Sequence, residues 1–300
     1  GRVATCYSGG FVFSAALTGA VNANQTVQRV AANLSASLVA RKGMNAPGIA
    51  GTTITSILGE SLDFPDTVLL RCTLSAPATS ATNEALWTFE TNSTQTLVMR
   101  KGDALHGLPG VMIAKFLKFW QVLSQPLALV QLTGTGVSAT NDVALVQVVP
   151  GSALTGPHVL LHEGDPAPGC GGATVGVIST IDIEPIIGHY LVLATLAGAP
   201  AGTELALFRG LTYSPMSQAA DLALRRPHAV LRKGQLFTNQ PGKLKSITLP
   251  TSTVTASGAG NVGLGTCIRR PTVFPYQSFT SIAIVVEFDN GVRQVMQAVP

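Results

Sequence analysis

The sequence predicts an all-β protein, a five-bladed β-propeller with four strands in each blade. Two observations lead to this prediction. A short loop motif recurs along the chain, and a longer block of apolar segments recurs in phase with it. Internal repeats of this length are typical of propellers and of other repeat architectures.

The loop motif consists of three apolar residues, two polar or charged residues, a glycine, and a loop that ends in a second glycine. Its copies read LVARKGMNAPG, LVMRKGDALHG, VLLHEGDPAPG and, less regularly, AVLRKGQLFTNQPG. The spacings between the anchoring glycines are 59, 62 and 70 residues, and these glycines are Gly43, Gly102, Gly164 and Gly234.

The apolar block occurs five times, at 9–31, 66–90, 125–148, 189–210 and 260–288. Five units in 300 residues give about 60 residues to each unit. We therefore predict a single propeller domain over residues 1–300, with approximate blades at 1–43, 44–102, 103–164, 165–234 and 235–300.

Within one unit we expect four strands: one after the glycine-proline loop, one around LLRCTL, one around ALWTF and one that ends in LVMRK. These runs are short, rich in Val, Ile and Leu, and separated by clusters of Gly, Pro, Ser, Asn and Thr, which is the pattern of strands. The best candidate for a helix is 113–123, with its two lysines, but we assign it as strand. The C-terminal run VRQVMQAV either closes the last blade or completes the first one, and the sequence leaves both open.

The composition fits a secreted repeat protein. Charged residues make up 11% of the chain, against about a quarter in an average protein. No uninterrupted run of about 18 apolar residues could span a membrane. The chain begins inside a repeat, so we expect a processed or trimmed chain, located at the cell surface or outside the cell.

The net charge is +4 and the pI about 9.0. Several basic residues come in pairs, which allows a basic rim that attracts anionic polysaccharide, lipid head groups or nucleic acid. No aromatic residues lie between the pairs, so we predict no nucleic-acid partner. We prefer the interpretation that the pairs end outer strands and discourage edge-to-edge association; they are Arg41-Lys42, Arg100-Lys101, Arg225-Arg226, Arg232-Lys233 and Arg269-Arg270.

The loop motif, a following V-x-x-A-T-L strand and a G-V-x-x-x-N-D turn together resemble a family of tandem-repeat proteins from bacterial surfaces. The resemblance covers about 38–210, and the role of that family is largely unassigned. Before the third strand, DFPD, SQP and IIGH stand where the family has Asn and Gly. The resemblance therefore implies fold and location more than activity.

The EGDPAPG stretch at 163–169 has two interpretations. As a structural corner, its prolines and glycines fix a bend between blades, and Asp165 caps its own turn. As a binding loop, it would hold a cation or a sugar at one face of the ring. We prefer the corner, because only Asp103 and Asp165 among the equivalent positions carry carboxylates and calcium requires more oxygens.

Catalysis by a glycosidase needs two opposed carboxylates. The candidates near predicted inner strands are Asp63, Asp66, Asp182 and Glu184; the last two alternate and so share one face of a strand. The five histidines have no metal-binding spacing, and we predict neither a metal nor a cofactor. Of the four cysteines, Cys6 and Cys267 lie in the first and last units and could form a disulfide that clasps the ring.

These considerations favour a non-catalytic secreted or surface propeller, not an enzyme, that binds a polysaccharide or a protein partner. The alternatives are a structural subunit that assembles with copies of itself, and a glycosidase-like hydrolase. The predicted ligand-binding residues on the loop face are Asp103, Asp165, Asp182, Glu184, Arg100 and Lys101.

Overall fold

The computed structural model describes residues 3–5, 10–63, 67–122, 125–149, 156–183, 188–212, 227–239, 241–249, 268–269 and 281–298. This part of the chain is all-β, and its one helical element is a single 3-10 turn, Val21–Ala23. It contains no helix that is long and apolar enough to cross a membrane.

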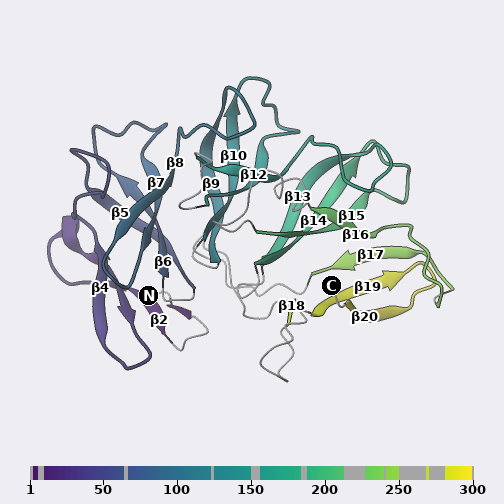
Figure 1. The fold of residues 1–300 in the computed structure, drawn as a ribbon, viewed down its shortest axis with the longest axis horizontal. Coiled ribbons are helices and arrows are strands. Elements are labelled where there is room, and N and C mark those ends of the chain that lie inside the picture. Colours follow the sequence, from purple (N-terminus) through teal and green to yellow (C-terminus); the bar gives the residue numbers. More distant parts are fainter. Residues whose placement is uncertain are drawn as a thin grey trace.

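The strands form five antiparallel sheets of four strands, which follow one another along the chain and lie in an arc (Figure 1). The first four sheets have their strands in sequence order: β1 Val3–Thr5, β2 Phe11–Ala16, β3 Gln25–Val30 and β4 Ala36–Arg41; β5 Ile54–Asp63, β6 Thr67–Leu74, β7 Glu84–Phe89 and β8 Gln95–Arg100; β9 Val111–Val122, β10 Gln125–Gly134, β11 Val143–Gln147 and β12 His158–His162; β13 Thr174–Ile183, β14 His189–Ala197, β15 Leu205–Leu211 and β16 His228–Arg232.

The fifth sheet is different. It contains β17 Leu244–Thr248, β18 Ile268–Arg269, β19 Ser281–Phe288 and β20 Arg293–Ala298. Both β17 and β18 pair with one edge of β19, and β20 pairs with the other. The C-terminal strand therefore belongs to the last sheet and does not complete the first one.

The all-β class, the four-stranded repeat and the assignment of 113–123 as strand are confirmed. Most of that segment lies in β9, which pairs with β10 along its whole length through two bulges. Its side chains alternate between the two adjacent sheet interfaces: Phe119 packs toward the second sheet and Trp120 toward the fourth. A segment buried on both faces loses the polar alternation of a surface strand, which is why it also resembled a helix.

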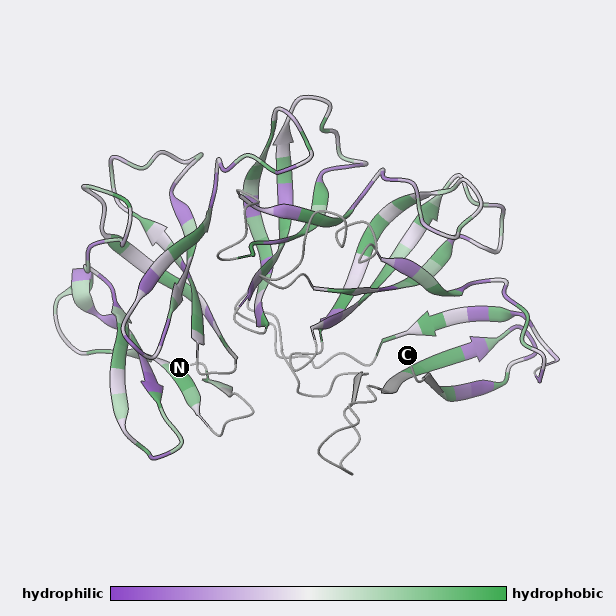
Figure 2. Ribbon diagram, in the orientation of Figure 1, coloured by the Kyte–Doolittle hydropathy of each residue, from purple (hydrophilic) through white to green (hydrophobic). Residues whose placement is uncertain are grey.

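Four apolar clusters hold the sheets together, one between each pair of consecutive sheets. Because the middle sheets are covered on both faces, all six residues of β7 are buried. Figure 2 shows the corresponding hydrophobic colouring along the strands of these sheets. Large aromatic side chains are buried in these interfaces, among them Trp87, Trp120 and Phe288.

The glycine motif forms the corner between consecutive sheets. The anchoring glycines have φ between +82° and +89°, a region that favours glycine. Each donates its N–H to a carbonyl near the start of the next sheet at 2.7–2.8 Å, in the pairs Gly43–Ile54, Gly102–Ile113, Gly164–Val175 and Gly234–Leu244. The repeated glycine is therefore required both by backbone conformation and by the joint between sheets.

First strands of consecutive sheets contact one another. β5 packs against β1 and against β9. In Figure 1 the lower ends of β9 and β13 point toward the concave side of the arc.

Candidate functional site

Two buried carboxylates lie near the inner ends of first strands. Asp182 on β13 and Glu60 on β5 are each only 4% exposed. Asp182 pairs with Leu191 and Glu60 with Leu70, so the two acids belong to different interfaces between sheets. Acidic side chains are rarely buried to this extent unless they are paired, and we take these two acids as the candidate active-site carboxylates.

Each of these acids has polar neighbours. The backbone N–H of Ile183 donates to Asp182 Oδ1 at 3.0 Å, a hydrogen bond that favours the ionised carboxylate. Glu60 lies close enough to Cys72 that its charge adds to the effect of burial, and both raise the pKa of that thiol. Cys72 is fully buried and reduced.

Amide and hydroxyl groups cluster on the neighbouring strand ends. Ser61, beside Glu60, accepts the backbone N–H of Gln121 through its Oγ at 3.1 Å. The side-chain amide of Gln121 is completely buried, and neither its nitrogen nor its oxygen has a hydrogen-bond partner within the described part of the chain. Gln147 donates to Gln125 in the same region. Buried amides of this kind can hydrogen-bond sugar hydroxyls, because each offers both a donor and an acceptor.

The acids of the corner loops are engaged within the loops. Asp103 accepts the backbone N–H of Arg100 at 2.6 Å, and burial raises the pKa of its carboxyl. Asp165 instead contacts the ring of His162, with 3.1 Å between Oδ1 and Nδ1. Asp103 therefore caps its corner through the backbone, whereas the contact of Asp165 is with a side chain and is not the predicted backbone cap.

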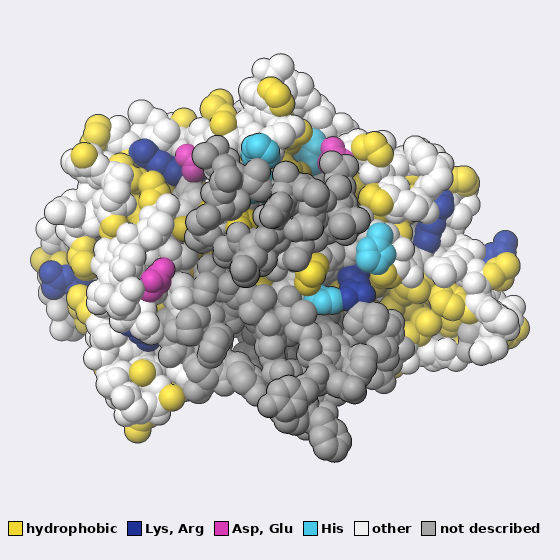
Figure 3. All heavy atoms as spheres, viewed as in Figure 1, with side chains coloured by type: hydrophobic (Ala, Val, Ile, Leu, Met, Phe, Trp, Pro, Cys, Tyr) yellow, Lys and Arg dark blue, Asp and Glu magenta, His cyan; other side chains and the backbone are white. Residues whose placement is uncertain are grey.

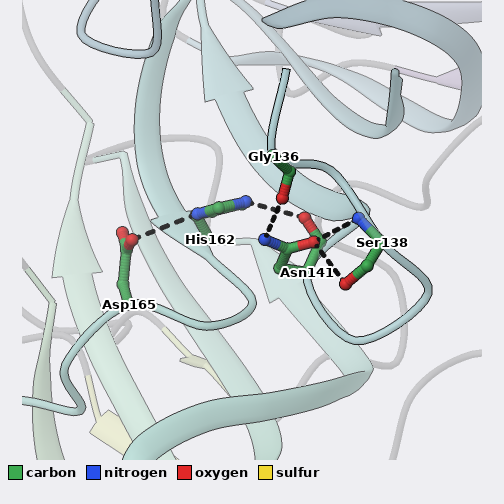
Figure 4. Close-up of polar contacts among 5 residues, drawn as sticks. All are labelled: Gly136, Ser138, Asn141, His162 and Asp165. Atoms are coloured by element: carbon green, nitrogen blue, oxygen red, sulfur yellow. Dashed lines mark hydrogen bonds and ion pairs between the residues drawn. The ribbon is translucent and has the colours of Figure 1, made fainter. Parts of the chain in front are cut away.

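His162 lies between Asp165 and the β10–β11 turn (Figure 4). Its Nε2 donates to the carbonyl of Asn141 at 2.8 Å while Nδ1 faces Asp165. Both ring nitrogens must carry a proton to make these two contacts, and the hydrogen bond to Asp165 raises the pKa of His162. A ring with both nitrogens engaged has no free nitrogen to act as a general base.

The same position is an arginine in other repeats. Arg100 donates through Nε to the carbonyl of Thr82 at 2.7 Å, and Arg232 to that of Thr203 at 3.3 Å. His162 therefore replaces an arginine that joins the outer strand to the turn before the third strand. An alignment of the four loop motifs places His162 in register with these arginines, so the sequence contained this signal.

Lys101 has a similar structural contact. Its Nζ donates to the carbonyl of Ser80 and to Asn83 Oδ1, at 2.5 and 3.3 Å. Arg100 and Lys101 are thus used within their own sheet, and neither converges with Asp182. In Figure 3 the described Lys and Arg side chains on the visible face form separate spots and not one basic patch.

Glu163 has a role that the sequence did not reveal. Its carboxylate accepts the N–H of Ile178, at a bulge in β13, at 2.8 Å, and burial raises its pKa. At the equivalent bulge of β5 in the second sheet, the N–H of Ile57 donates at 3.0 Å to the side chain of Gln25, which lies on β3 of the first sheet. The two acceptors reach the bulge from different strands, so no sequence motif links them.

His189 and Arg209 form a contact on β14 and β15. Arg209 Nε donates to His189 Nδ1 at 3.0 Å. Burial, together with the Arg209 charge, lowers the pKa of His189 to about 4, so that the imidazole is neutral. Across the described ranges no three His, Cys, Asp or Glu side chains are grouped so that they could hold a metal ion.

Some predicted residues are not described. The backbone of Asp63 is the end of β5, while Asp66, Glu184, Cys6 and Cys267 lie outside the described residues. The predicted clasp between the two cysteines therefore stays a prediction. The remaining cysteine, Cys170, is buried and reduced.

The chain belongs to a protein family of unknown function, DUF7453, whose model matches residues 8–207. No curated protein sequence matches the chain. The family match does not bear on the predicted resemblance to bacterial surface repeat proteins, which stays a prediction.

Several solved structures are similar to the chain. An α-L-arabinofuranosidase of family GH93 from Fusarium graminearum, in complex with arabinobiose, has 11% identity and a TM-score of 0.34, and 98% of this chain aligns with 79% of that one. The α-L-arabinofuranosidase Arb93A from the same organism, with an iminosugar inhibitor, has 10% identity and a TM-score of 0.37 over the same shares. An α-L-arabinofuranosidase from Lactobacillus brevis has 10% identity and a TM-score of 0.31, with 98% and 87% covered.

These comparisons correct two predictions. The sequence favoured a non-catalytic binding protein and no enzyme, and both predictions are wrong by this comparison, because the matching structures are glycoside-cleaving enzymes. The sequence misled us because acids on strands are usually solvent-facing, whereas Asp182 is buried. At these identities and TM-scores, no activity or site residue is transferred to this chain.

Proposed function

We propose that the chain is a glycoside hydrolase built on a five-bladed propeller, with its active centre where the first strands end. The observation that supports this most is the pair of buried carboxylates, Asp182 and Glu60, each 4% exposed on a first strand. In the proposed ring, the fifth sheet also meets the first, and the first strands surround the centre.

The chemistry requires two carboxyl groups on either side of the glycosidic bond, one to protonate the leaving oxygen and one to act as base or nucleophile. Asp182 fits the second role, because the N–H of Ile183 stabilises its ionised form. Glu60 pairs with Leu70, a member of the apolar cluster between the first and second sheets. As the second buried carboxyl group on a first strand, Glu60 is assigned proton donation.

The surroundings suit a carbohydrate. The amide of Gln121 and the hydroxyl of Ser61 lie on neighbouring strand ends, and sugar recognition uses such groups. The similar structures are arabinofuranosidases, so an α-L-arabinofuranoside is the first substrate to assay. The expected extracellular location would give access to polysaccharide and is part of the proposal.

The test is hydrolysis of a panel of aryl glycosides that begins with the α-L-arabinofuranoside. Asp182→Asn and Glu60→Gln keep the side-chain size and remove the charge, and each should lower kcat/KM roughly 10²-fold or more. Glu90→Gln, at an exposed turn, is the matched control and should leave the rate unchanged. Circular dichroism and urea unfolding show whether each variant folds.

Three results would reject the proposal. The first is that the wild-type chain hydrolyses neither a member of the panel nor an arabinan. The folded Asp182→Asn variant may retain full activity. The Glu90→Gln control may lose as much activity as the two substitutions at buried acids.

A further inference from the structure

The third strands of the third and fourth sheets carry polar side chains at equivalent positions. Each of these side chains donates to a residue on the second strand, two positions before the leucine with which the donor pairs. The donor and acceptor are Arg209 and His189 in the fourth sheet, and Gln147 and Gln125 in the third. The paired leucines are Leu191 and Leu127. Arg209 therefore occupies the position of Gln147, and His189 that of Gln125.

The two hydrogen-bonded pairs differ in charge and in burial. Gln147 and Gln125 are neutral, and they are 0% and 3% exposed. Arg209 is charged and, like His189, half-buried. A neutral pair completes the third sheet at this position, so the charge of Arg209 is not needed to complete a sheet. Because a charge that is partly removed from water costs free energy unless it is paired, the arginine calls for a partner.

No acidic side chain of the described residues offsets the charge of Arg209. None of their ion pairs includes this arginine, and burial lowers the pKa of its guanidinium. Its partner His189 is neutral and accepts through Nδ1. A ring that accepts at Nδ1 carries its proton on Nε2. His189 therefore adds a hydrogen-bond donor and no negative charge, and the two side chains together suit an anion.

Arg209 lies in one row of the fourth sheet with Asp182 and His228. Leu191 pairs with Asp182 on one side and with Arg209 on the other. Arg209 in turn pairs with His228, which is exposed. Residues paired in this way share one face of an antiparallel sheet, here the face on which Leu191 packs against the fifth sheet. Asp182 and Arg209 are two strands apart, about 10 Å between backbones, so one extended ligand can reach both.

We propose that Arg209, with His189 and His228 beside it, binds the carboxylate of an acidic sugar in the glycan substrate. This inference rests on the proposed hydrolase function, because it places the same sugar chain at Asp182. Arg209 directs Nε and Nη2 at His189 Nδ1, at 3.0 and 2.5 Å. The N–H groups that remain on Nη1 and Nη2 form a fork that matches the two oxygens of a carboxylate. A uronic acid residue supplies such a carboxylate on a sugar ring.

The probe is a short oligogalacturonate, and its methyl ester is the matched ligand without charge. Titration calorimetry is carried out on the full chain with the substitution Asp182→Asn, so that the ligand stays intact during the measurement. The acid should bind at least about tenfold more tightly than the ester, because the ester cannot form the charged pair with Arg209.

Arg209→Gln installs the side chain that the third sheet has at this position, which can still donate to His189. This variant should bind the acid at least about tenfold more weakly and the ester within about threefold of the unsubstituted position. A general loss of structure would instead weaken both ligands. Lys233→Gln is the control, since Lys233 lies beyond the other end of β16 in an ion pair with Glu204, and it should bind both ligands as before.

Several results would overturn the acid site. Equal binding of acid and ester would do so, as would an unchanged affinity of Arg209→Gln for the acid. Inorganic phosphate that binds as tightly as the acid, and only with Arg209 present, would make this a site for any anion. Glu184 and Asp221 lie outside the described residues. If Glu184→Gln or Asp221→Asn raised the affinity for the acid about tenfold, a carboxylate of the chain itself would be the partner of Arg209.

The binding measurement separates this inference from the proposed function. A chain that prefers the acid over the ester through Arg209, but cleaves no glycoside, would retain the acid site and reject the hydrolase. A chain that cleaves a neutral glycoside, but binds acid and ester alike, would retain the hydrolase and reject the acid site.

Discussion

The contact of His162 with Asp165 should make the stability of this protein depend on pH in a way that arginine would not. His162 donates to the Asn141 carbonyl at 2.8 Å and faces Asp165 at 3.1 Å. We consider the substitution His162→Arg, which installs the residue that other repeats have at this position. Arginine stays charged at every accessible pH.

The sign follows from the raised pKa of His162, whose main cause is the hydrogen bond to Asp165. A group with a folded-state pKa above its unfolded value of about 6.5 adds stability that is fully present below that value. This stability is lost as the pH rises through the folded-state pKa. Relative to His162→Arg, the wild-type chain should therefore become less stable from pH 6 to pH 9.

Solvent exposure of the ion pair limits how much the free energy of unfolding can change with pH. The carboxylate side of the pair is 48% exposed, and such ion pairs contribute about 0–1 kcal/mol. The hydrogen bond to Asn141 survives deprotonation, because the neutral ring can keep its proton on Nε2. We therefore expect the free energy of unfolding of wild type to fall by about 0.5–1 kcal/mol relative to His162→Arg over this range.

Urea unfolding at several pH values between 6 and 9 measures this difference. Asp165→Asn should remove most of the pH dependence, since the neutral amide no longer favours the imidazolium. Parallel curves for wild type and His162→Arg across this range would refute the reasoning.

Three further outcomes are expected. Gly43→Ala should destabilise the chain by about 1–3 kcal/mol more than Gly107→Ala. Both glycines have φ near +88°, but a Cβ on Gly43 would lie 2.7 Å from a backbone carbonyl oxygen, whereas a Cβ on Gly107 would have no heavy atom within 4 Å. Equal unfolding midpoints for the two variants would contradict this. Glu163→Leu should cost about 1–3 kcal/mol by leaving the N–H of Ile178 without its acceptor, whereas Glu163→Gln should be nearly neutral, and urea titrations in which both variants behave alike would exclude this role. His189 has a pKa lowered to about 4, so the unfolded state binds its proton first as the pH falls; His189→Gln should reduce the loss of stability between pH 6.5 and pH 4, and an unchanged acid profile would show that this histidine does not titrate as described.

Much of the fold could be predicted from the sequence, because the corner imposes a local requirement at fixed intervals. Gly43, Gly102 and Gly164 need positive φ at each joint between sheets, and no other residue meets that need so easily. The spacing of these glycines therefore reported the length of one sheet. The strand order within a unit followed from short connections between consecutive strands.

The site was harder to predict because it depends on burial across sheets. Asp182 looked like any acid on a strand, and only the packing of the fourth and fifth sheets makes it a buried carboxylate. Glu60 could not be predicted, because its sequence neighbours give no sign that it faces the first sheet.

The most direct test of the central claim is the ratio of kcat/KM for wild type and Asp182→Asn on the aryl glycoside that the wild-type chain cleaves fastest. If Asp182 supplies a carboxylate at the reacting bond, the variant should fold normally and lose roughly 10²-fold or more in kcat/KM. A folded variant with an unchanged ratio, or a wild-type chain that cleaves no glycoside, would contradict the assignment of this protein as a glycoside hydrolase.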